Sequence, residues 1–261
     1  MNRIENKFAQ LKKNKRKAFI AFITAGYPNL GVTEKLILEF DRIGVDIIEL
    51  GVPFSDPMAD GPVIQEASQY ALNKKTHLID ILNMVSRVRK QTKLPICLMT
   101  YYNPIFCFGD AAFAKAARVC GVDGVIIPDL PPEEGRDLIN ACAKNKVDII
   151  SFIAPTTSRE RMKKIAKAAK GFIYYVSLTG TTGARKALPK DLVANLKAIK
   201  KLTKKPVCAG FGISTAAQVK EIKKISDGVI IGSAIVKKIK ENIGKPGLVS
   251  SVGRFTHQLN V

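Results

Sequence analysis

Eight short apolar runs, separated by segments with helical periodicity, constrain the fold of this chain more than any other feature. Between the runs, apolar residues recur at the spacing of an amphipathic helix, as in Val32, Leu36, Ile37 and Phe40. Strands that alternate with helices form parallel, right-handed crossovers. Eight such units in 261 residues fit a (β/α)8 barrel better than an open doubly wound sheet. The eight runs are Ala18–Thr24, Asp46–Leu50, Pro95–Thr100, Gly124–Ile127, Asp148–Ile153, Phe172–Ser177, Pro206–Ala209 and Gly228–Ile231.

No linker or low-complexity segment divides the sequence, so we predict an α/β fold with one TIM-barrel domain over residues 1–261. An extra helix is expected before the first strand, because Ile4, Phe8 and Leu11 fall at i, i+4 and i+7. The stretches RIGVDIIELG, VCGVDGVIIPD and KISDGVIIGS each combine a helix end, a turn and a strand start. Such echoes are expected of repeated strand–helix units.

The formal net charge of +20 raises the possibility of a nucleic-acid partner. The pattern argues against one, because Lys163, Lys164, Lys167 and Lys170 alternate with apolar residues and no aromatic side chains interleave with them. These lysines fit the solvated face of a helix. We therefore expect no nucleic-acid partner and a general attraction for anionic ligands.

The apolar runs and the cysteines indicate the compartment. No run approaches the roughly 20 residues of a membrane span, and the first residues lack the apolar core of a signal peptide. Five cysteines, an odd number without a C-x-x-C pair, favour free thiols in a reducing compartment, and no zinc-like spacing is present. We expect a cytoplasmic protein without a membrane partner or a metal site.

Glu49 is unusual because it stands near the end of an apolar strand. Side chains alternate along a strand, so Glu49 shares the inward face with Ile47. A carboxylate is costly to bury without a use or a partner, and burial raises its pKa toward neutrality. The sequence thus predicts an acid–base residue at the mouth of the barrel, and an ion pair or a helix cap is the structural alternative.

Asp60 lies on the stiff acidic loop that follows, ending in Gly61 and Pro62. Nearer to solvent than Glu49, it is expected to stay ionised and to accept a substrate N–H or O–H. Histidine chemistry is nearly excluded, because His77 stands at a helix start and His257 near the C-terminus. A Ser-His-Asp arrangement would therefore lack its histidine.

The loops after the seventh and eighth runs predict a phosphate site. Gly210 and Gly212 let the backbone approach an anion, Ser214 is expected to cap the next helix, and Gly232-Ser233 opens a short helix whose free N–H groups favour phosphate. In a (β/α)8 barrel the usual phosphate site lies there. The alternative is that these glycines serve tight turns only. A dinucleotide fingerprint is absent, because Thr215 replaces its third glycine.

The loop after the sixth run, with Gly180, Gly183 and three threonines, is expected to form a lid that closes over a substrate. An ordinary flexible turn is the alternative.

Five stretches resemble the tryptophan synthase alpha subunit family: ELGVPFSDPMADGPVIQ, LMTYYNP, GFIYYVS, AGFGIS and DGVIIGSAIV. They extend over essentially the whole chain, and the first is highly specific. The resemblance implies retro-aldol cleavage of indole-3-glycerol phosphate to indole and glyceraldehyde 3-phosphate.

The resemblance also implies residue roles. Glu49 would protonate indole C3 and help to remove the glycerol hydroxyl proton, while Asp60 would bind the indole N–H. Tyr174 would line the site, and Thr182 would bond Asp60 when the lid closes. The remaining substrate contacts would be Phe22, Met99 and Phe211 on the indole ring and Gly183, Gly212, Gly232 and Ser233 on the phosphate. One departure from the family pattern, Leu178–Thr181, falls in a variable part of the lid.

A partner is implied as well, because the family forms half of an α2β2 complex whose β subunit carries pyridoxal phosphate and receives the indole. No cofactor is implied for this chain. The residues matching the region that faces β are Asp56, Tyr102, Asn103 and Pro104. Two alternatives remain open: a catalytically weak α subunit that mainly activates β, and a different phosphate-binding barrel such as a sugar-phosphate isomerase.

Overall fold

A closed sheet of eight parallel strands forms the centre of the molecule, and the strands follow one another around it in chain order. The computed structural model describes residues 2–176, 192–210 and 212–260. The strands are β1 (Ala18–Thr24), β2 (Ile47–Gly51), β3 (Ile96–Met99), β4 (Gly124–Ile126), β5 (Asp148–Ile153), β6 (Ile173–Val176), β7 (Val207–Gly210) and β8 (Gly228–Ile231). Each lies within one residue of its predicted run, so the predicted (β/α)8 barrel is confirmed.

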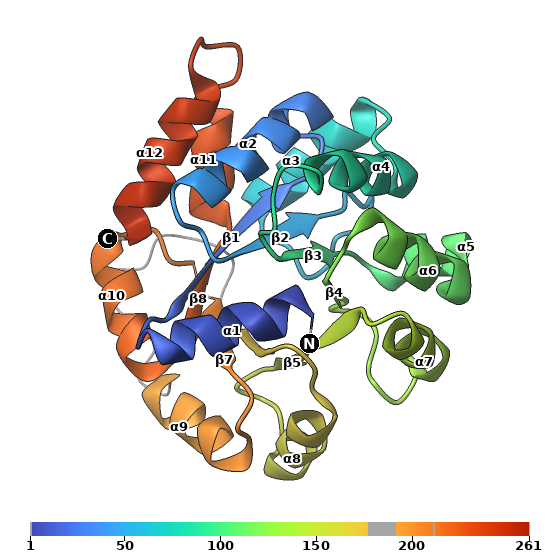
Figure 1. Ribbon diagram of the computed structural model, residues 1–261, viewed down its shortest axis with the longest axis vertical. Coiled ribbons are helices and arrows are strands. Elements are labelled where there is room, and N and C mark those ends of the chain that lie inside the picture. The colour runs from blue at the N-terminus through green and yellow to red at the C-terminus, as the bar shows by residue number, and fades with distance from the viewer. Residues whose placement is uncertain (1, 177–191, 211, 261) are drawn as a thin grey trace.

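The helices surround this barrel (Figure 1). They are α1 (Arg3–Lys13), α2 (Leu30–Arg42), α3 (Pro62–Asn73), α4 (Leu78–Val88), α5 (Tyr102–Phe108), α6 (Asp110–Cys120), α7 (Arg136–Lys144), α8 (Arg159–Ala168), α9 (Leu192–Leu202), α10 (Ala216–Ile225), α11 (Ser233–Lys240) and α12 (Leu248–Asn260). No described helix has the length and apolar character needed to cross a bilayer.

Alternation along the strands divides the apolar residues into two cores. The outer core packs the strands against the helices. The inner core fills the barrel with every second residue, such as Ile20 and Ile47, and it includes Cys97 and Cys208 as small buried side chains. All five cysteines are free thiols, as the sequence predicts.

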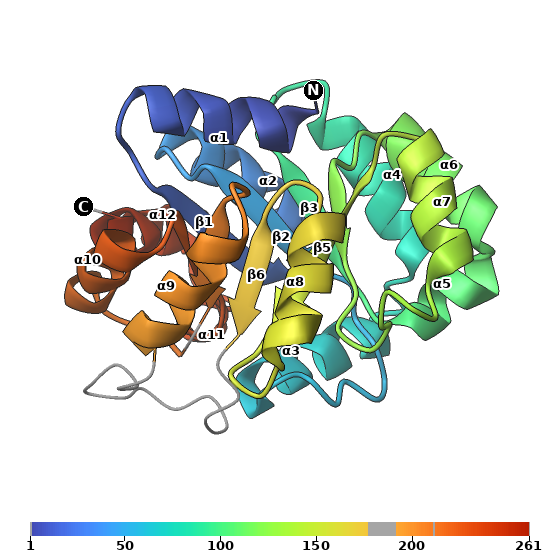
Figure 2. The ribbon, with the colours of Figure 1, turned by 90° about the horizontal axis from the view of Figure 1, so that it is seen from below.

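The N-terminal helix α1 covers the amino end of the barrel, and Figure 2 shows it lying across that end, opposite the end toward which the strands run. Ile4, Phe8 and Leu11 are all buried and belong to the inner core. Asn2 and Glu5 form a reciprocal capping box that starts the helix. The predicted extra helix is therefore present, and it closes the amino end of the barrel.

The three similar stretches RIGVDIIELG, VCGVDGVIIPD and KISDGVIIGS make the same kind of contact at the amino end of the barrel. Each places an aspartate directly before a strand, and its carboxylate accepts a backbone N–H bond from the neighbouring strand. Asp46, Asp123 and Asp227 bond the N–H groups of Phe19, Ile96 and Val207 at 3.0, 3.0 and 3.1 Å. Each aspartate also pairs with cations, so three interstrand joints are fixed in the same way.

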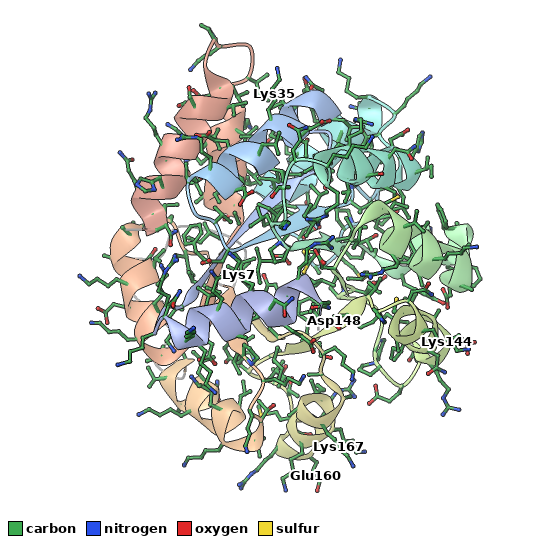
Figure 3. All side chains as sticks on the ribbon, in the orientation of Figure 1. Lys7, Lys35, Lys144, Asp148, Glu160 and Lys167 are labelled. Atoms are coloured by element: carbon green, nitrogen blue, oxygen red, sulfur yellow. The ribbon has the colours of Figure 1, made fainter. Side chains whose placement is uncertain are left out.

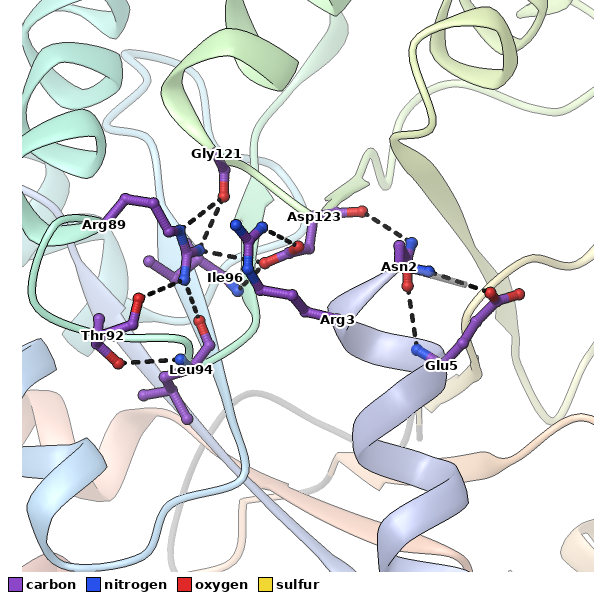
Figure 4. A network of polar contacts seen from close by, with 9 residues as sticks. All are labelled: Asn2, Arg3, Glu5, Arg89, Thr92, Leu94, Ile96, Gly121 and Asp123. Carbon is purple, nitrogen blue, oxygen red and sulfur yellow. Dashed lines mark hydrogen bonds and ion pairs between the residues drawn. The ribbon is translucent and has the colours of Figure 1, made fainter.

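Figure 4 shows the contacts of Asp123. It is 1% exposed and pairs with Arg3 of α1 at 2.8 Å and with Arg89 at 3.2 Å. The Arg89 guanidinium also donates to the carbonyl oxygens of Gly121 and Leu94. One buried carboxylate therefore ties α1, the end of α4 and two strands together.

We predict that Asp123→Ala lowers the free energy of unfolding by about 3 kcal/mol, because it leaves the Arg89 charge without its partner. Urea denaturation followed by circular dichroism measures this loss. Glu221→Ala is the control, since it removes an exposed ion pair with Lys224 and should cost less than about 1 kcal/mol. Equal losses in the two variants would contradict the structural importance of Asp123.

Candidate active site

Glu49 lies inside the mouth of the barrel, near the carboxyl end of β2. Its register neighbours are Phe22 on β1 and Cys97 on β3, and the residue is 1% exposed. Neither carboxylate oxygen has a hydrogen-bond partner among the described residues. The structural alternative, an ion pair or a helix cap, therefore finds no support in the described part of the chain.

The dry surroundings change the acidity of Glu49. Burial raises its pKa to about 8, and the nearby charge of Asp60 adds to the effect. The shift has the direction predicted from the sequence. At neutral pH the carboxyl group is mainly protonated, so it is available as a proton donor.

Asp60 lies on the loop between β2 and α3 and is half-buried. Burial raises its pKa to about 6, and a hydrogen bond from the hydroxyl of Tyr101 to Oδ2, 3.2 Å long, opposes that rise. Asp60 is therefore mainly ionised at neutral pH, as predicted. Its protonation state is the opposite of that of Glu49.

Tyr101 holds the Asp60 loop in place, a role that the sequence does not reveal. Its hydroxyl accepts a 2.9 Å bond from the backbone N–H of Ala59 while it donates to Asp60. Its ring stacks on Phe54 with centroids 5.0 Å apart, and the residue is 3% exposed. These contacts join the loops after β2 and β3, so no local sequence signal could have identified them.

Two aromatic rings line the mouth, and glycines make room for them. A Cβ atom on Gly51 would lie 2.6 Å from the Phe22 ring, and one on Gly232 would lie 3.2 Å from it. A Cβ atom on Gly210 would lie 2.6 Å from the hydroxyl of Tyr174. Gly210 therefore makes room for the Tyr174 ring, and its expected role in letting the backbone approach an anion stays a prediction.

Phe152 is a second side chain that the sequence analysis missed. It lies on the inward face of β5, and its ring centroid is 5.0 Å from that of Tyr174. Because side chains alternate along a strand, the position of Phe152 two residues after Ile150 could have predicted that it faces inward.

Burial and the charge of Glu49 raise the pKa of Tyr174 well above its usual value, so its hydroxyl stays protonated. Met99, at the end of β3, is half-buried beside the same inner core.

The predicted phosphate loops stand at the same end of the barrel. Gly232 is the N-cap of α11 and Ser233 its first residue, and no side chain caps this helix. Unpaired N–H groups at a helix start are suited to an anion. Gly212 is exposed in the loop after β7.

The prediction that Ser214 caps the next helix is wrong. The N-cap of α10 is Thr215, which forms a reciprocal capping box with Gln218. Threonine followed three residues later by glutamine satisfies two backbone N–H groups at once, which a cap one residue earlier would not.

Thr182, Gly183, Phe211 and the predicted lid lie outside the described residues. His77 is the exposed N-cap of α4, and His257 is exposed on α12. No group of three or more potential metal ligands occurs among residues 2–176, 192–210 and 212–260.

The residues matched to a partner interface lie on two adjacent loops. Asp56 is exposed and accepts a bond from the hydroxyl of Ser55. Tyr102, Asn103 and Pro104 form the first turn of α5. Large apolar side chains are exposed nearby on the same elements, Met58 at 85% and Phe106 at 67%. Contiguous exposed apolar side chains are typical of protein–protein interaction sites.

The barrel and its mouth define a class of protein: an enzyme of the (β/α)8-barrel type whose mouth holds two carboxyl groups with separated pKa values. The particular family follows from comparison with known proteins. The sequence pattern that describes the tryptophan synthase alpha chain matches residues 8–254. The chain belongs to this family.

Individual relatives agree. The tryptophan synthase alpha chain of Citrifermentans bemidjiense is 47% identical over 259 residues, which cover 99% of this chain and 97% of the relative. That of Geobacter sulfurreducens is 51% identical over 238 residues, 91% and 90% of the two chains. The crystal structure of the Legionella pneumophila alpha subunit superposes with a TM-score of 0.92 at 38% identity, covering 100% and 97%. A Mycobacterium tuberculosis tryptophan synthase structure gives 0.90 at 33% identity, covering 100% and 99%.

Members of this family are lyases that cleave indole-3-glycerol phosphate in tryptophan biosynthesis. The reaction expected from the sequence motifs is therefore confirmed for this chain.

We predict that Glu49→Gln stabilises the fold at high pH. A carboxyl group whose pKa rises from 4.5 to about 8 on folding weakens the fold as pH increases between those values. The neutral amide does not undergo this loss, so the variant should be more stable than the unsubstituted protein by about 4 kcal/mol at pH 8. The difference should disappear near pH 4.5. Urea denaturation across this pH range tests the prediction, and a constant difference would contradict it.

We predict that Tyr101→Phe moves the acid limb of kcat/KM to higher pH by about one unit. The lost hydrogen bond stabilises the ionised form of Asp60, and a bond to a charged group is worth about 1.5 kcal/mol or more. A pH profile of indole release measures the shift. Tyr102→Phe is the control, because the Tyr102 hydroxyl points to Asp110. Superimposable profiles for all three proteins would refute a role for Tyr101.

Proposed function

We propose that Glu49 is the proton-transferring residue in cleavage of indole-3-glycerol phosphate. The observation that supports this most is a carboxyl group buried in the mouth without a hydrogen-bond partner among the described residues. With a pKa of about 8 it is protonated before the reaction and can protonate indole C3. Its conjugate base then takes the glycerol hydroxyl proton as the carbon–carbon bond breaks, which regenerates the acid.

Asp60 has the complementary role in this proposal. Protonation at C3 places positive charge on the indole ring nitrogen. An ionised Asp60 accepts the indole N–H bond and stabilises that charge. Its pKa of about 6 supports this role, because the group is charged when Glu49 is not.

The remaining contacts follow the shape of the mouth. Phe22, Met99, Tyr174 and Phe211 would contact the indole ring. The phosphate would bind to backbone N–H groups at the start of α11, through Gly232 and Ser233, together with Gly212 and Gly183. Thr182 would contact Asp60 once substrate is bound.

We further propose that residues 1–261 form one cytoplasmic domain that pairs with a β subunit in an α2β2 complex. The exposed side chains of Met58 and Phe106 beside Asp56 and Tyr102–Pro104 support an interface on these loops. Pyridoxal phosphate would belong to the β subunit, and the chemistry of this chain would use its own side chains. Indole would pass from the mouth to the partner.

We predict that Glu49→Gln reduces indole formation from indole-3-glycerol phosphate at least ~10²-fold, because the amide cannot transfer a proton. Glu134→Gln is a matched control, since Glu134 is exposed on the loop after β4 and should leave the rate unchanged. Indole is assayed with the purified chain alone and with a β subunit. Unchanged turnover in the Glu49 variant would refute the assignment.

The same assay separates the alternatives. A catalytically weak α subunit would raise the activity of β without releasing indole itself. A sugar-phosphate isomerase would leave indole-3-glycerol phosphate intact in both arms. Release of indole by the chain alone excludes both.

A further inference from the structure

The outer face of β5 is incompletely covered by helices. Strands β1, β2, β4, β7 and β8 are buried at every residue, whereas two residues on the outer face of β5, Ile149 and Ser151, are half-exposed. Ile149 and Ser151 point outward from it, because Ile150 between them belongs to the inner core. In a barrel of this kind such positions normally lie beneath helices.

A cavity of about 670 Å³ occupies this place, on the outside of the barrel between α7 and α8. Figure 1 shows these two helices on either side of β5. The volume is in the range of small-molecule sites. The cavity extends from the loop after β4 to the turn before β5, so it follows a strand about 20 Å long. Its apolar lining comes mainly from Ile127, Leu130, Ile139, Ala143, Ile149 and Ile165.

Cationic side chains gather where the cavity reaches the amino end of β5. Arg118, Lys146 and Lys170 line this end, are exposed, and form no ion pair with a described residue. Of the two acids there, Glu5 is engaged in the capping box of α1. Asp148 points toward the barrel interior, and burial raises its pKa. Figure 3 shows Asp148 beside the N-terminal end of α1.

At the other end of the cavity, near the carboxyl end of β5, the charged side chains Arg161 and Asp129 have partners. Arg161 of α8 forms a 3.2 Å ion pair with Glu133. The carboxylate of Asp129 accepts bonds from the backbone N–H of Tyr102. The cavity is thus a long apolar space, and the cationic side chains of its lining that form no ion pair with a described residue lie at one end, where Lys170 also acts on the charge of Asp148.

We propose that this cavity binds an amphipathic carboxylate with one unbranched apolar chain, of the medium-chain fatty-acid class. The chain would lie along β5 between Ile139 and Ile165, above Ser151. The carboxylate would meet Lys146 and Lys170 at the amino end. The net charge of +20 adds a general attraction for such an anion. The site is separate from the catalytic mouth and does not depend on the proposed roles of Glu49 and Asp60.

The test is isothermal titration of the purified chain with dodecanoate below its micelle concentration, at low ionic strength. We expect saturable one-to-one binding. Lys146→Glu/Lys170→Glu should weaken it at least 10-fold by removing the charge that meets the carboxylate. Ala143→Trp should weaken it similarly by filling the apolar space from the exposed side of α7, without disturbing the buried strand.

The matched control is Lys144→Glu/Lys167→Glu, which makes the same change of charge on α7 and α8. Both lysines are exposed, neither lines the cavity, and Figure 3 shows them pointing outward. This variant should bind dodecanoate within twofold of the unsubstituted chain. Dodecyltrimethylammonium, which has the same tail and a cationic head, should bind at least 10-fold more weakly.

Three results would overturn the proposal. One is the absence of saturable binding. Another is equal weakening by the control and cavity-end substitutions, which would indicate general attraction to a basic surface. The third is full binding in both Ala143→Trp and Lys146→Glu/Lys170→Glu, which would place the ligand elsewhere.

Discussion

Closure of a parallel sheet into a barrel is the constraint on which the rest of this structure depends. Once eight strands close in chain order, every strand residue faces either the helices or the interior, and alternation decides which. Ile47 faces inward and so must Glu49, two residues later. The acid is therefore fixed in a dry place by the backbone itself.

Three aspartates at the amino end of the barrel and Glu49 at the carboxyl end differ in how their buried charge is compensated. At the amino end, Asp46, Asp123 and Asp227 have backbone N–H donors and cationic partners, so their burial is compensated. At the carboxyl end, Glu49 is buried without a hydrogen-bond partner among the described residues. An uncompensated carboxyl group destabilises a fold at neutral pH. The aspartate contacts and the α1 plug supply stability away from the mouth, which allows the mouth to keep a reactive group.

Much of this arrangement follows from sequence pattern, because alternation and helical periodicity act over a few residues. They predicted the eight strands, the α1 helix and the inward Glu49. Contacts between loops distant in sequence could not be predicted in this way. Tyr101 meets Asp60 because two loops converge, Gly210 is small because Tyr174 lies against it, and Thr215 displaces Ser214 as a cap because of Gln218. The partial exposure of β5 could not be predicted from the sequence either. The residues Val147–Ile150 repeat the residues Val45–Ile48, so the pattern gives no sign that helices cover β5 less completely than β2.

The relation between the two carboxyl groups links this geometry to the reaction. The charge of Asp60 raises the cost of ionising Glu49, which is fully enclosed, whereas Asp60 has a hydroxyl donor. As pH rises, Asp60 therefore loses its proton before Glu49 does, and Glu49 stays mainly protonated between about pH 6 and pH 8. A group that must protonate carbon and a group that must stabilise the resulting cation need these opposite states at the same pH. Burial depth and one tyrosine hydroxyl therefore separate the pKa values of two acids that lie at different depths in one mouth.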